Sequence, residues 1–346
     1  MGSITFDDSI KSISIENNRN IDDIIIPGFV DLHCHGGNGF DTMKGSSSIQ
    51  SMSIFHLKNG TTTLLPTTLT AKLEDTLVAM KGFNSLIKKN KSKTNILGVH
   101  LEGPFINPNK LGAQPSFAQL PNIDFINKIE EEAIIKVITL APELEGSVKF
   151  VKYLITKKIK VQIGHSLANY ETCMKIFKKN NIGFTHLYNA MSGNDHRNPG
   201  VLTAALKNAK YAEIICDLNH VNKANIYLAH KCIPKLYAVS DSISATGMPD
   251  GDYDFANIKI TKKNNKALTK NNILAGSIVT MYDTFKNLVK INFPLNDAVA
   301  MTSYNAAQYL DEKNIGKIEK GYCSNFIVLD NKLNIKQVYL YGNLVK

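Results

Sequence analysis

The segment Ile24–His35, IIIPGFVDLHCH, is a short apolar run rich in β-branched residues that ends in two histidines. Further runs of this kind follow, and each also ends in or beside polar residues that can take part in chemistry. They are TTTLLPT (61–67), NILGVHLEG (95–103), IKVITLAPE (135–143), KVQIGHS (160–166), GFTHLYNA (183–190), AEIICDLNH (212–220) and LYAVSDS (236–242). Compact β-branched runs are typical of strands buried on both faces, so the sequence predicts eight such strands.

Stretches with helical spacing of apolar residues separate these strands. In Ala71–Lys89, Leu73 and Leu77 share one face, and Asn169–Asn181 repeats the pattern. Alternating strands and helices predict parallel βαβ units, and eight units fit a closed (β/α)8 TIM barrel over residues 27–310. A doubly wound open sheet is the structural alternative, but reactive residues at nearly every strand end favour the closed barrel.

Other parts of the chain follow a different pattern. Residues 311–346 alternate apolar and polar positions, which predicts β-strands. Together with residues 1–26 they predict a small β-domain built from both chain ends. Between Ser242 and Ser277 the sequence predicts a hairpin followed by a loop, and a helix that begins near Ser277.

The amino-acid composition argues against several classes of protein. The 346 residues carry a formal net charge of +10, but 38 of the 40 basic residues are lysines spread along the chain. Because arginine makes the commonest base-specific contacts, this pattern argues against nucleic-acid binding. The sequence has no apolar run of about 18 residues and no signal-peptide pattern, and its five cysteines include no C-x-x-C. We therefore expect a cytoplasmic protein without a membrane span.

The histidines suggest a metal site. His33 and His35 are two positions apart on one predicted strand, so their imidazoles face the same side. Other predicted strand ends carry further imidazoles and carboxylates, namely Glu102, His165, His186, His220 and Asp241. In a barrel these ends open onto one face, where imidazole and carboxylate groups would bind a divalent metal.

Several motifs, in order and spacing, resemble one enzyme family. PGFVDLHCHGG, HLEGPFINPNKLGAQ, GHS, THLYNAM, NPG, LNH, SDS, LAGS and TSYNAA are similar to those of the N-acetylglucosamine-6-phosphate deacetylases in the amidohydrolase superfamily. The resemblance runs from about Pro27 to the end of the chain. It implies a (β/α)8 barrel with a small β-sandwich, and hydrolysis of N-acetyl-D-glucosamine 6-phosphate to D-glucosamine 6-phosphate and acetate.

The resemblance also implies roles for individual residues. Glu102, His165 and His186 match the shared metal ligands, His33 and His35 match a pair that holds a second metal, and Asp241 matches the catalytic acid/base. The implied cofactor is one or two divalent ions per subunit, with Zn²⁺ preferred and Fe²⁺, Co²⁺ or Mn²⁺ as alternatives. The implied substrate-binding positions are Ala113, Gln114, Asn189, Ala190, Arg197, His220, Leu274, Ala275 and Gly276. Arg197 matches a residue that reaches the neighbouring subunit's substrate, which implies a homodimer.

Two departures from the family pattern affect these expectations. Gln114 stands where some members carry a histidine, so the donor to the developing oxyanion could be Gln114, His220 or a second metal. About 26 residues precede PGF, so the N-terminal part of the small domain is expected to be reduced. Two alternative functions remain: another amidohydrolase, such as a cyclic amidase or a deaminase, and an inactive phosphosugar-binding protein. ITLAPE lacks the lysine that cyclic amidases usually carry there, and the complete ligand set argues against an inactive protein.

Overall fold

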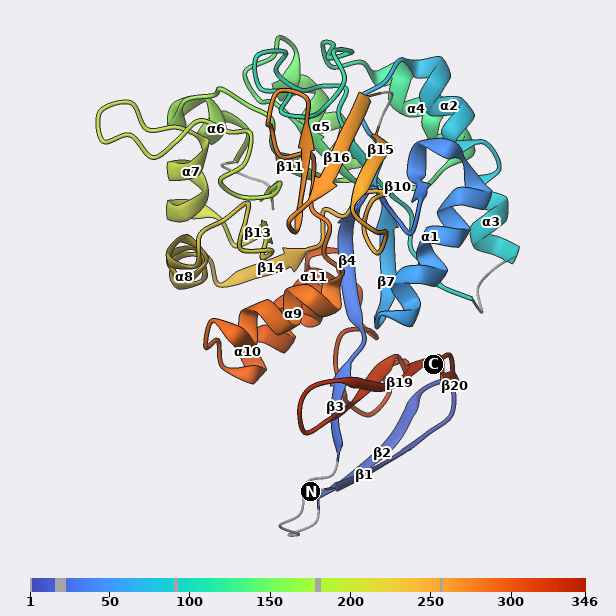
Figure 1. The fold of residues 1–346 in the computed structure, drawn as a ribbon. Coiled ribbons are helices and arrows are strands. Elements are labelled where there is room, and N and C mark those ends of the chain that lie inside the picture. The colour runs from blue at the N-terminus through green and yellow to red at the C-terminus, as the bar shows by residue number, and fades with distance from the viewer. Residues whose placement is uncertain (1, 16–22, 90–92, 178–181, 256–257) are drawn as a thin grey trace.

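Parallel strands form the centre of the computed structural model, which describes residues 2–15, 23–89, 93–177, 182–255 and 258–346 (Figure 1). They form three parallel sheets, ordered β4-β7-β8, β9-β10-β11-β12 and β13-β14. Their bounds are β4 (Phe29–Cys34), β7 (Thr61–Pro66), β8 (Asn95–Ile96), β9 (Val99–Glu102), β10 (Ile135–Leu140), β11 (Lys160–Ile163), β12 (Gly183–Phe184), β13 (Tyr211–Ile215) and β14 (Lys235–Val239). Each of the eight predicted runs overlaps at least one of these strands.

Single bridges link the three sheets. Thr67 pairs in parallel with His100, and Cys34 pairs in parallel with Ser242. The amide of Leu187 donates to the carbonyl oxygen of Glu213 at 2.8 Å. The structure thus confirms an α/β fold with parallel strands, although its ladders over the described residues do not form one continuous closed barrel.

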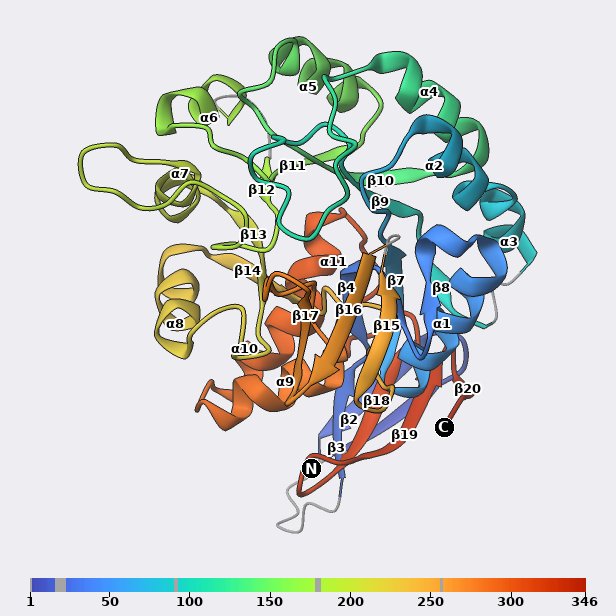
Figure 2. The same cartoon turned by 45° about the horizontal axis from the view of Figure 1, so that its top comes forward.

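Most helices lie outside the parallel strands, whereas α11 (Asn305–Tyr309) is seen within their ring in Figure 2. The other helices are α1 (Ser46–Lys58), α2 (Leu73–Met80), α3 (Phe83–Lys89), α4 (Ile123–Glu132), α5 (Ser147–Thr156), α6 (Tyr170–Phe177), α7 (Val201–Asn208), α8 (Lys223–Cys232), α9 (Met281–Lys290) and α10 (Leu295–Val299). A 3-10 turn at Thr42–Lys44 precedes α1, and a π-helical turn at Ala300–Tyr304 joins α10 to α11.

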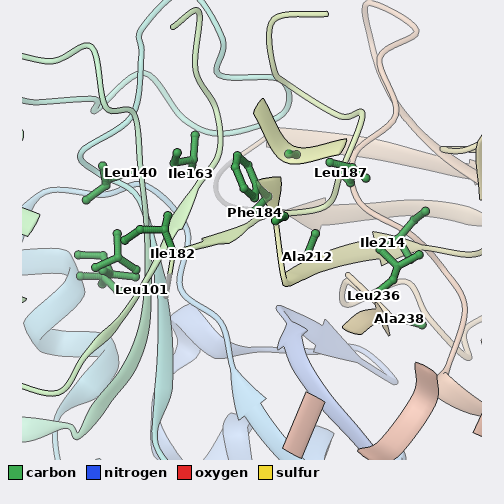
Figure 3. Close-up of a cluster of buried hydrophobic side chains, with 14 of the residues drawn as sticks. Leu101, Leu140, Ile163, Ile182, Phe184, Leu187, Ala212, Ile214, Leu236 and Ala238 are labelled. Carbon is green, nitrogen blue, oxygen red and sulfur yellow. The ribbon is translucent and has the colours of Figure 1, made fainter. Parts of the chain in front are cut away.

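Successive side chains of a strand point to opposite faces, so a parallel strand can contribute to two different hydrophobic clusters. On β13, Ala212 and Ile214 belong to the cluster that packs the strands against the helices (Figure 3). Tyr211 and Ile215 of the same strand belong to a second cluster. This leaves Glu213 on the face opposite to Ile214, with the inward-facing polar residues of the neighbouring strands.

The predicted helix over Ala71–Lys89 is wrong in one respect, because it is two helices, α2 and α3. The break falls at Lys81 and Gly82, and Gly82 has a φ of 74°, a left-handed conformation that glycine adopts without steric cost. The predicted helix Asn169–Asn181 corresponds to α6, and residues 178–181 lie outside the described residues.

Three antiparallel sheets complete the fold. One is ordered β20-β19-β18-β3 and one β1-β2, and both lie near the chain ends (Figure 1). The third, β15-β16-β17, covers the segment predicted as a hairpin and loop, so the prediction missed its last strand. The bounds are β1 (Gly2–Phe6), β2 (Ile10–Ile15), β3 (Asp23–Pro27), β15 (Gly251–Phe255), β16 (Ile258–Lys263), β17 (Lys266–Thr269), β18 (Phe326–Asp330), β19 (Ile335–Leu340) and β20 (Asn343–Leu344), besides the two-residue strands β5 (Gly36–Gly37) and β6 (Phe40–Asp41). No helix in the described ranges is long and apolar enough to cross a membrane.

Candidate metal centre and active site

Glu102, the last residue of β9, lies at the centre of a buried cluster. Its Oε1 is 3.1 Å from Nε2 of His165 and 3.0 Å from Nε2 of His186. The two Nε2 atoms are themselves 3.1 Å apart. All three residues are at most 4% exposed. Three potential ligand atoms therefore converge on one point, as the sequence predicted from the ends of different strands.

A second group of donors adjoins the first. Nε2 of His33 is 3.2 Å from Nε2 of His35, and Oδ1 of Asp241 lies 3.4 and 3.3 Å from these two atoms. The other carboxylate oxygen of Glu102, Oε2, is 3.2 Å from Nε2 of His35. Glu102 thus contacts both groups, and its two oxygens could serve two neighbouring ions.

The backbone at several of these positions is unusual. His165, His186 and Asp241 have φ values of 49°, 26° and 47°. Non-glycine residues in sparsely populated backbone regions cost about 1–3 kcal/mol each, and they persist where the surrounding structure fixes them, often at active sites. Each residue directly follows or lies just beyond a parallel strand, so the left-handed turn determines where its side chain points.

The pKa values show that the cluster attracts cations. Burial lowers the pKa of His35, but its hydrogen bonds to Asp241 and Glu102 outweigh burial and raise that pKa to about 9. Burial raises the pKa of Glu102, yet the charge of His33 and hydrogen bonds from His165 and His186 hold it well below its ordinary value. The neighbouring carboxylates thus favour the protonated forms of His33 and His35. A divalent ion can replace those protons, and the imidazole and carboxylate donors fit such an ion.

Asp241 combines the same environment with access to the cavity. Burial raises its pKa, but the charge of His33 and the hydrogen bond and charge of His35 lower it below the ordinary value of an aspartate. The carboxylate is therefore ionised at neutral pH and can accept a proton.

A cavity of about 510 Å³ opens above this cluster. Most of the residues predicted for substrate binding line this cavity. Its lining also includes Asp241 and four candidate metal ligands, namely His35, Glu102, His165 and His186. The predicted lining residues are Ala113, Gln114, Asn189, Ala190, His220, Leu274 and Gly276. The lining also includes residues that were not singled out from the sequence: Asn109, Lys110, Gly112, Ile215, Phe255, Asn272 and Ile273. Asn109 and Lys110 fall within the HLEGPFINPNKLGAQ motif, which could have identified them.

Three predicted residues lie away from this lining. His33 is fully buried beneath it. Ala275 is also buried, and its amide donates to the carbonyl oxygen of Ala267 at 3.0 Å. Arg197 is exposed on the loop after β12, where its own amide donates to Oδ1 of Asp195 at 2.8 Å. The structure therefore does not bring Arg197 into the cavity of its own chain.

Two candidate oxyanion donors differ in how they are held. Nε2 of Gln114 donates to Oε2 of Glu102, and its Oε1 accepts from the amide of Thr70 at 2.7 Å. His220 is held by Asp217, whose Oδ2 is 2.6 Å from Nδ1 of the ring. Burial lowers the pKa of His220, but the hydrogen bond and charge of Asp217 outweigh burial and raise that pKa. This contact orients the imidazole and leaves Nε2 for a ligand in the cavity.

The sequence analysis did not identify Glu213. This carboxylate is fully buried, and together with His33 and His100 it forms a third group with convergent potential ligand atoms. Its sequence signal was a carboxylate next to the start of the apolar run AEIICDLNH, between Ala212 and Ile214.

Parallel strands whose ends gather imidazoles and carboxylates at a cavity define the class of metal-dependent α/β hydrolases. Residues 24–345 match the model of the amidohydrolase family. The chain belongs to this family.

Individual proteins are similar along nearly the whole chain. An N-acetylglucosamine-6-phosphate deacetylase from Lysinibacillus sphaericus is 33% identical over 328 residues, covering 92% of this chain and 85% of that protein. An N-acetylgalactosamine-6-phosphate deacetylase from Escherichia coli O157:H7 is 28% identical over 345 residues, covering 97% and 91%. The crystal structure of N-acetylglucosamine-6-phosphate deacetylase from Thermotoga maritima superposes with a TM-score of 0.92 at 29% identity, covering 99% of this chain and 94% of that one.

Proposed function

We propose that this protein hydrolyses the acetamido group of N-acetyl-D-glucosamine 6-phosphate, giving D-glucosamine 6-phosphate and acetate. The observation that carries this proposal is the cavity, whose lining includes Asp241, four candidate metal ligands and most of the predicted substrate-binding residues. The similarity to deacetylases along more than nine-tenths of the chain supports the same substrate class.

The metal would be held by this chain's own imidazoles and carboxylates. We assign Glu102, His165 and His186 to one divalent ion, and His33 and His35 to a second, with Zn²⁺ preferred and Fe²⁺, Co²⁺ or Mn²⁺ as alternatives. A divalent ion, when bound, supplies Lewis acidity that activates water at neutral pH and polarises an amide carbonyl.

Asp241 acts as the proton carrier in this proposal. As an ionised carboxylate, it accepts the proton of the attacking water, and as the resulting acid it delivers that proton to the leaving amine. One carboxylate thus serves as base and then as acid. We assign the oxyanion contact to His220, because Asp217 fixes its ring and favours its charged form, whereas Gln114 is engaged with Glu102.

The phosphate requires a cation. Arg197 is exposed and does not line its own chain's cavity, which is consistent with a homodimer in which Arg197 binds the phosphate in the neighbouring subunit. Its planar guanidinium can bind two phosphate oxygens at once. Lys110 is the one lysine or arginine among the described residues lining the cavity, and it provides a second positive charge from the same chain.

We further propose that the three parallel sheets belong to one closed (β/α)8 barrel of residues 27–310. The bridges Thr67–His100 and Cys34–Ser242 support this, because they continue the parallel order between sheets. Residues 1–26 and 311–346 would form the small β-sandwich. In support, β3 pairs with β18, and after Gly28 the chain continues as β4 in a parallel sheet.

A panel of sugars tests the proposed function. Metal content is measured on protein purified without added metal, and acetate release is measured on N-acetylglucosamine, its 6-phosphate and N-acetylgalactosamine 6-phosphate. We expect bound divalent metal and fastest release from N-acetylglucosamine 6-phosphate. Faster release from the galactosamine compound would assign the specificity of the Escherichia coli relative instead. Phosphosugar binding without acetate release by the metal-loaded protein would contradict the proposal and identify a binding protein.

A further inference from the structure

Glu213 is a carboxylate buried below the cavity that the proposed reaction does not use. It lies on β13 with no solvent exposure, and it does not line the cavity. Among the described residues, its charged partners are histidines, His33 at 2.9 Å and His100 at 3.9 Å, and neither lysine nor arginine pairs with it. A buried carboxylate is costly unless it is hydrogen-bonded, so its contacts should reveal why it is present.

Each oxygen of Glu213 has its own partners. Oε1 accepts from Nε2 of Gln162 at 2.9 Å, and the same Gln162 nitrogen donates to the hydroxyl of Tyr237 at 2.8 Å. Oε2 accepts from Nδ1 of His33 at 2.9 Å and from the amide of His186 at 3.3 Å. One side of the carboxylate is thus anchored in the interior, and the other side contacts two candidate metal ligands.

The contact with His33 determines which nitrogen of that ring carries a proton. An ionised carboxylate is a hydrogen-bond acceptor, so Nδ1 of His33 must be the N–H donor. The lone pair of the neutral ring then belongs to Nε2. Nε2 is the atom that faces the cluster, 3.2 Å from His35 and 3.4 Å from Asp241. The geometry therefore presents His33 to the cluster in the form that can bind a metal.

We propose that Glu213 is a positioning residue for the metal site: it holds His33 in the ligand tautomer and orientation, and it anchors the backbone at His186. This inference rests on the proposed function only in taking His33 as a metal ligand. A carboxylate that accepts the second N–H of a ligand histidine fixes the ring and raises its basicity, and loss of such a partner typically weakens metal affinity 10–100-fold.

Glu213→Gln is the decisive variant because it preserves size and removes the charge. Gln162 requires an acceptor opposite it, so the new amide would keep its oxygen there and turn its NH₂ toward His33. Nδ1 of His33 would then have to accept a hydrogen bond, which moves the ring proton to Nε2, the atom that faces the cluster. We expect the affinity for the metal at His33 to fall about 10–100-fold.

The measurement is titration of metal-free protein with Co²⁺ or Zn²⁺, following the number of ions bound and their dissociation constants. Glu213→Asp keeps the charge on a shorter side chain and should recover part of the lost affinity. Thr139→Val is the matched control: Thr139 is buried in the same interior network, and its hydroxyl bonds to His100 at 2.8 Å and to Thr185 at 2.7 Å rather than to Glu102, Asp241 or the four histidines assigned to the ions. It should bind metal like the unchanged protein.

A second comparison separates positioning from general damage to the fold. In a His33→Asn background, Glu213→Gln should weaken metal binding far less than it does in the unchanged protein, because the ring it positions is gone and only its contact with the His186 amide remains. The proposal is overturned if folded Glu213→Gln protein binds both ions with unchanged affinity, or if Thr139→Val loses as much. It is also overturned if His33→Asn itself leaves the number of bound ions and their affinity unchanged. These titrations need no substrate, so their outcome is independent of whether the protein releases acetate.

Discussion

The bottom of the cavity and its rim differ in burial and in the elements that carry their side chains. At the bottom, Glu102 and the candidate ligand histidines are at most 4% exposed. Two of the imidazole rings also contact backbone carbonyl oxygens through the nitrogen that faces away from the cluster. Nδ1 of His35 contacts the carbonyl oxygen of Thr67 at 3.1 Å, and Nδ1 of His165 contacts that of Lys110 at 2.8 Å. At the rim, Lys110 is partly exposed, and Arg197 lies outside the cavity lining on an exposed loop. In our proposal, the reactive groups are therefore fixed by the strands, whereas phosphate recognition depends on loops and on a second subunit.

The largest expected effect comes from removing a ligand at the bottom. His165→Ala deletes an imidazole that converges with Glu102 and His186, so one ion loses a ligand and the Lewis acidity it supplies. We expect kcat/KM to fall about 10⁴-fold or more, because a metal contributes several kcal/mol to the transition state. Metal content should fall in parallel. Full metal content and an unchanged rate would remove His165 from the site.

Asp241→Asn comes next. The amide retains the shape of the side chain but cannot accept a proton, so kcat should fall about 10²–10⁴-fold, the range typical of general acid–base groups. Substrate affinity, measured by titration of the inactive protein, should change little. If the variant keeps more than about a tenth of the rate, another group carries the proton.

The same contrast explains how much the sequence could predict. The candidate ligands at the bottom could be predicted because each ends or follows an apolar run, and parallel strand ends meet on one side of a sheet. The left-handed backbone at His186 and the contact of Glu213 with His33 were not predicted, because both depend on residues far apart in the sequence. The break of the predicted Ala71–Lys89 helix at Gly82 was missed because helical periodicity on either side concealed it. The resemblance implied that Arg197 reaches the neighbouring subunit's substrate, and the structure places Arg197 outside the lining of its own chain's cavity.

At the rim, Arg197→Lys should act on phosphate recognition alone. Lysine keeps the charge but loses the second hydrogen bond, and a charge-assisted bond is worth about 1.5–3 kcal/mol, or a factor of about 10–150 in kcat/KM. The phosphorylated sugar should lose this factor, and plain N-acetylglucosamine should be little affected. Equal losses on both sugars would mean that Arg197 supports the fold or the dimer.

Mixing two impaired proteins tests whether Arg197 acts across subunits. A mixed dimer of Arg197→Lys and Asp241→Asn chains would contain one complete site, because the first chain keeps Asp241 and the second supplies Arg197. We expect the mixture, after subunit exchange, to be more active than either parent on the phosphorylated sugar. If confirmed subunit exchange brings no gain, Arg197 acts within its own chain or not on the substrate.

The smallest effect is expected for Lys110→Gln. The carbonyl oxygen of Lys110 supports His165 and is retained in the variant, so only the ammonium group is removed. That group is partly exposed at the cavity and acts as a point charge, so its interaction with phosphate resembles an exposed ion pair worth about 0.2–1 kcal/mol. We expect at most about a fivefold loss of kcat/KM on the phosphorylated sugar, shrinking further as salt is added. Lys152→Gln, at an exposed position on α5, is the control for loss of one positive charge and should have no effect. A loss of equal size on unphosphorylated N-acetylglucosamine would instead show that the substitution disturbs His165, and would place Lys110 with the bottom of the cavity rather than with its rim.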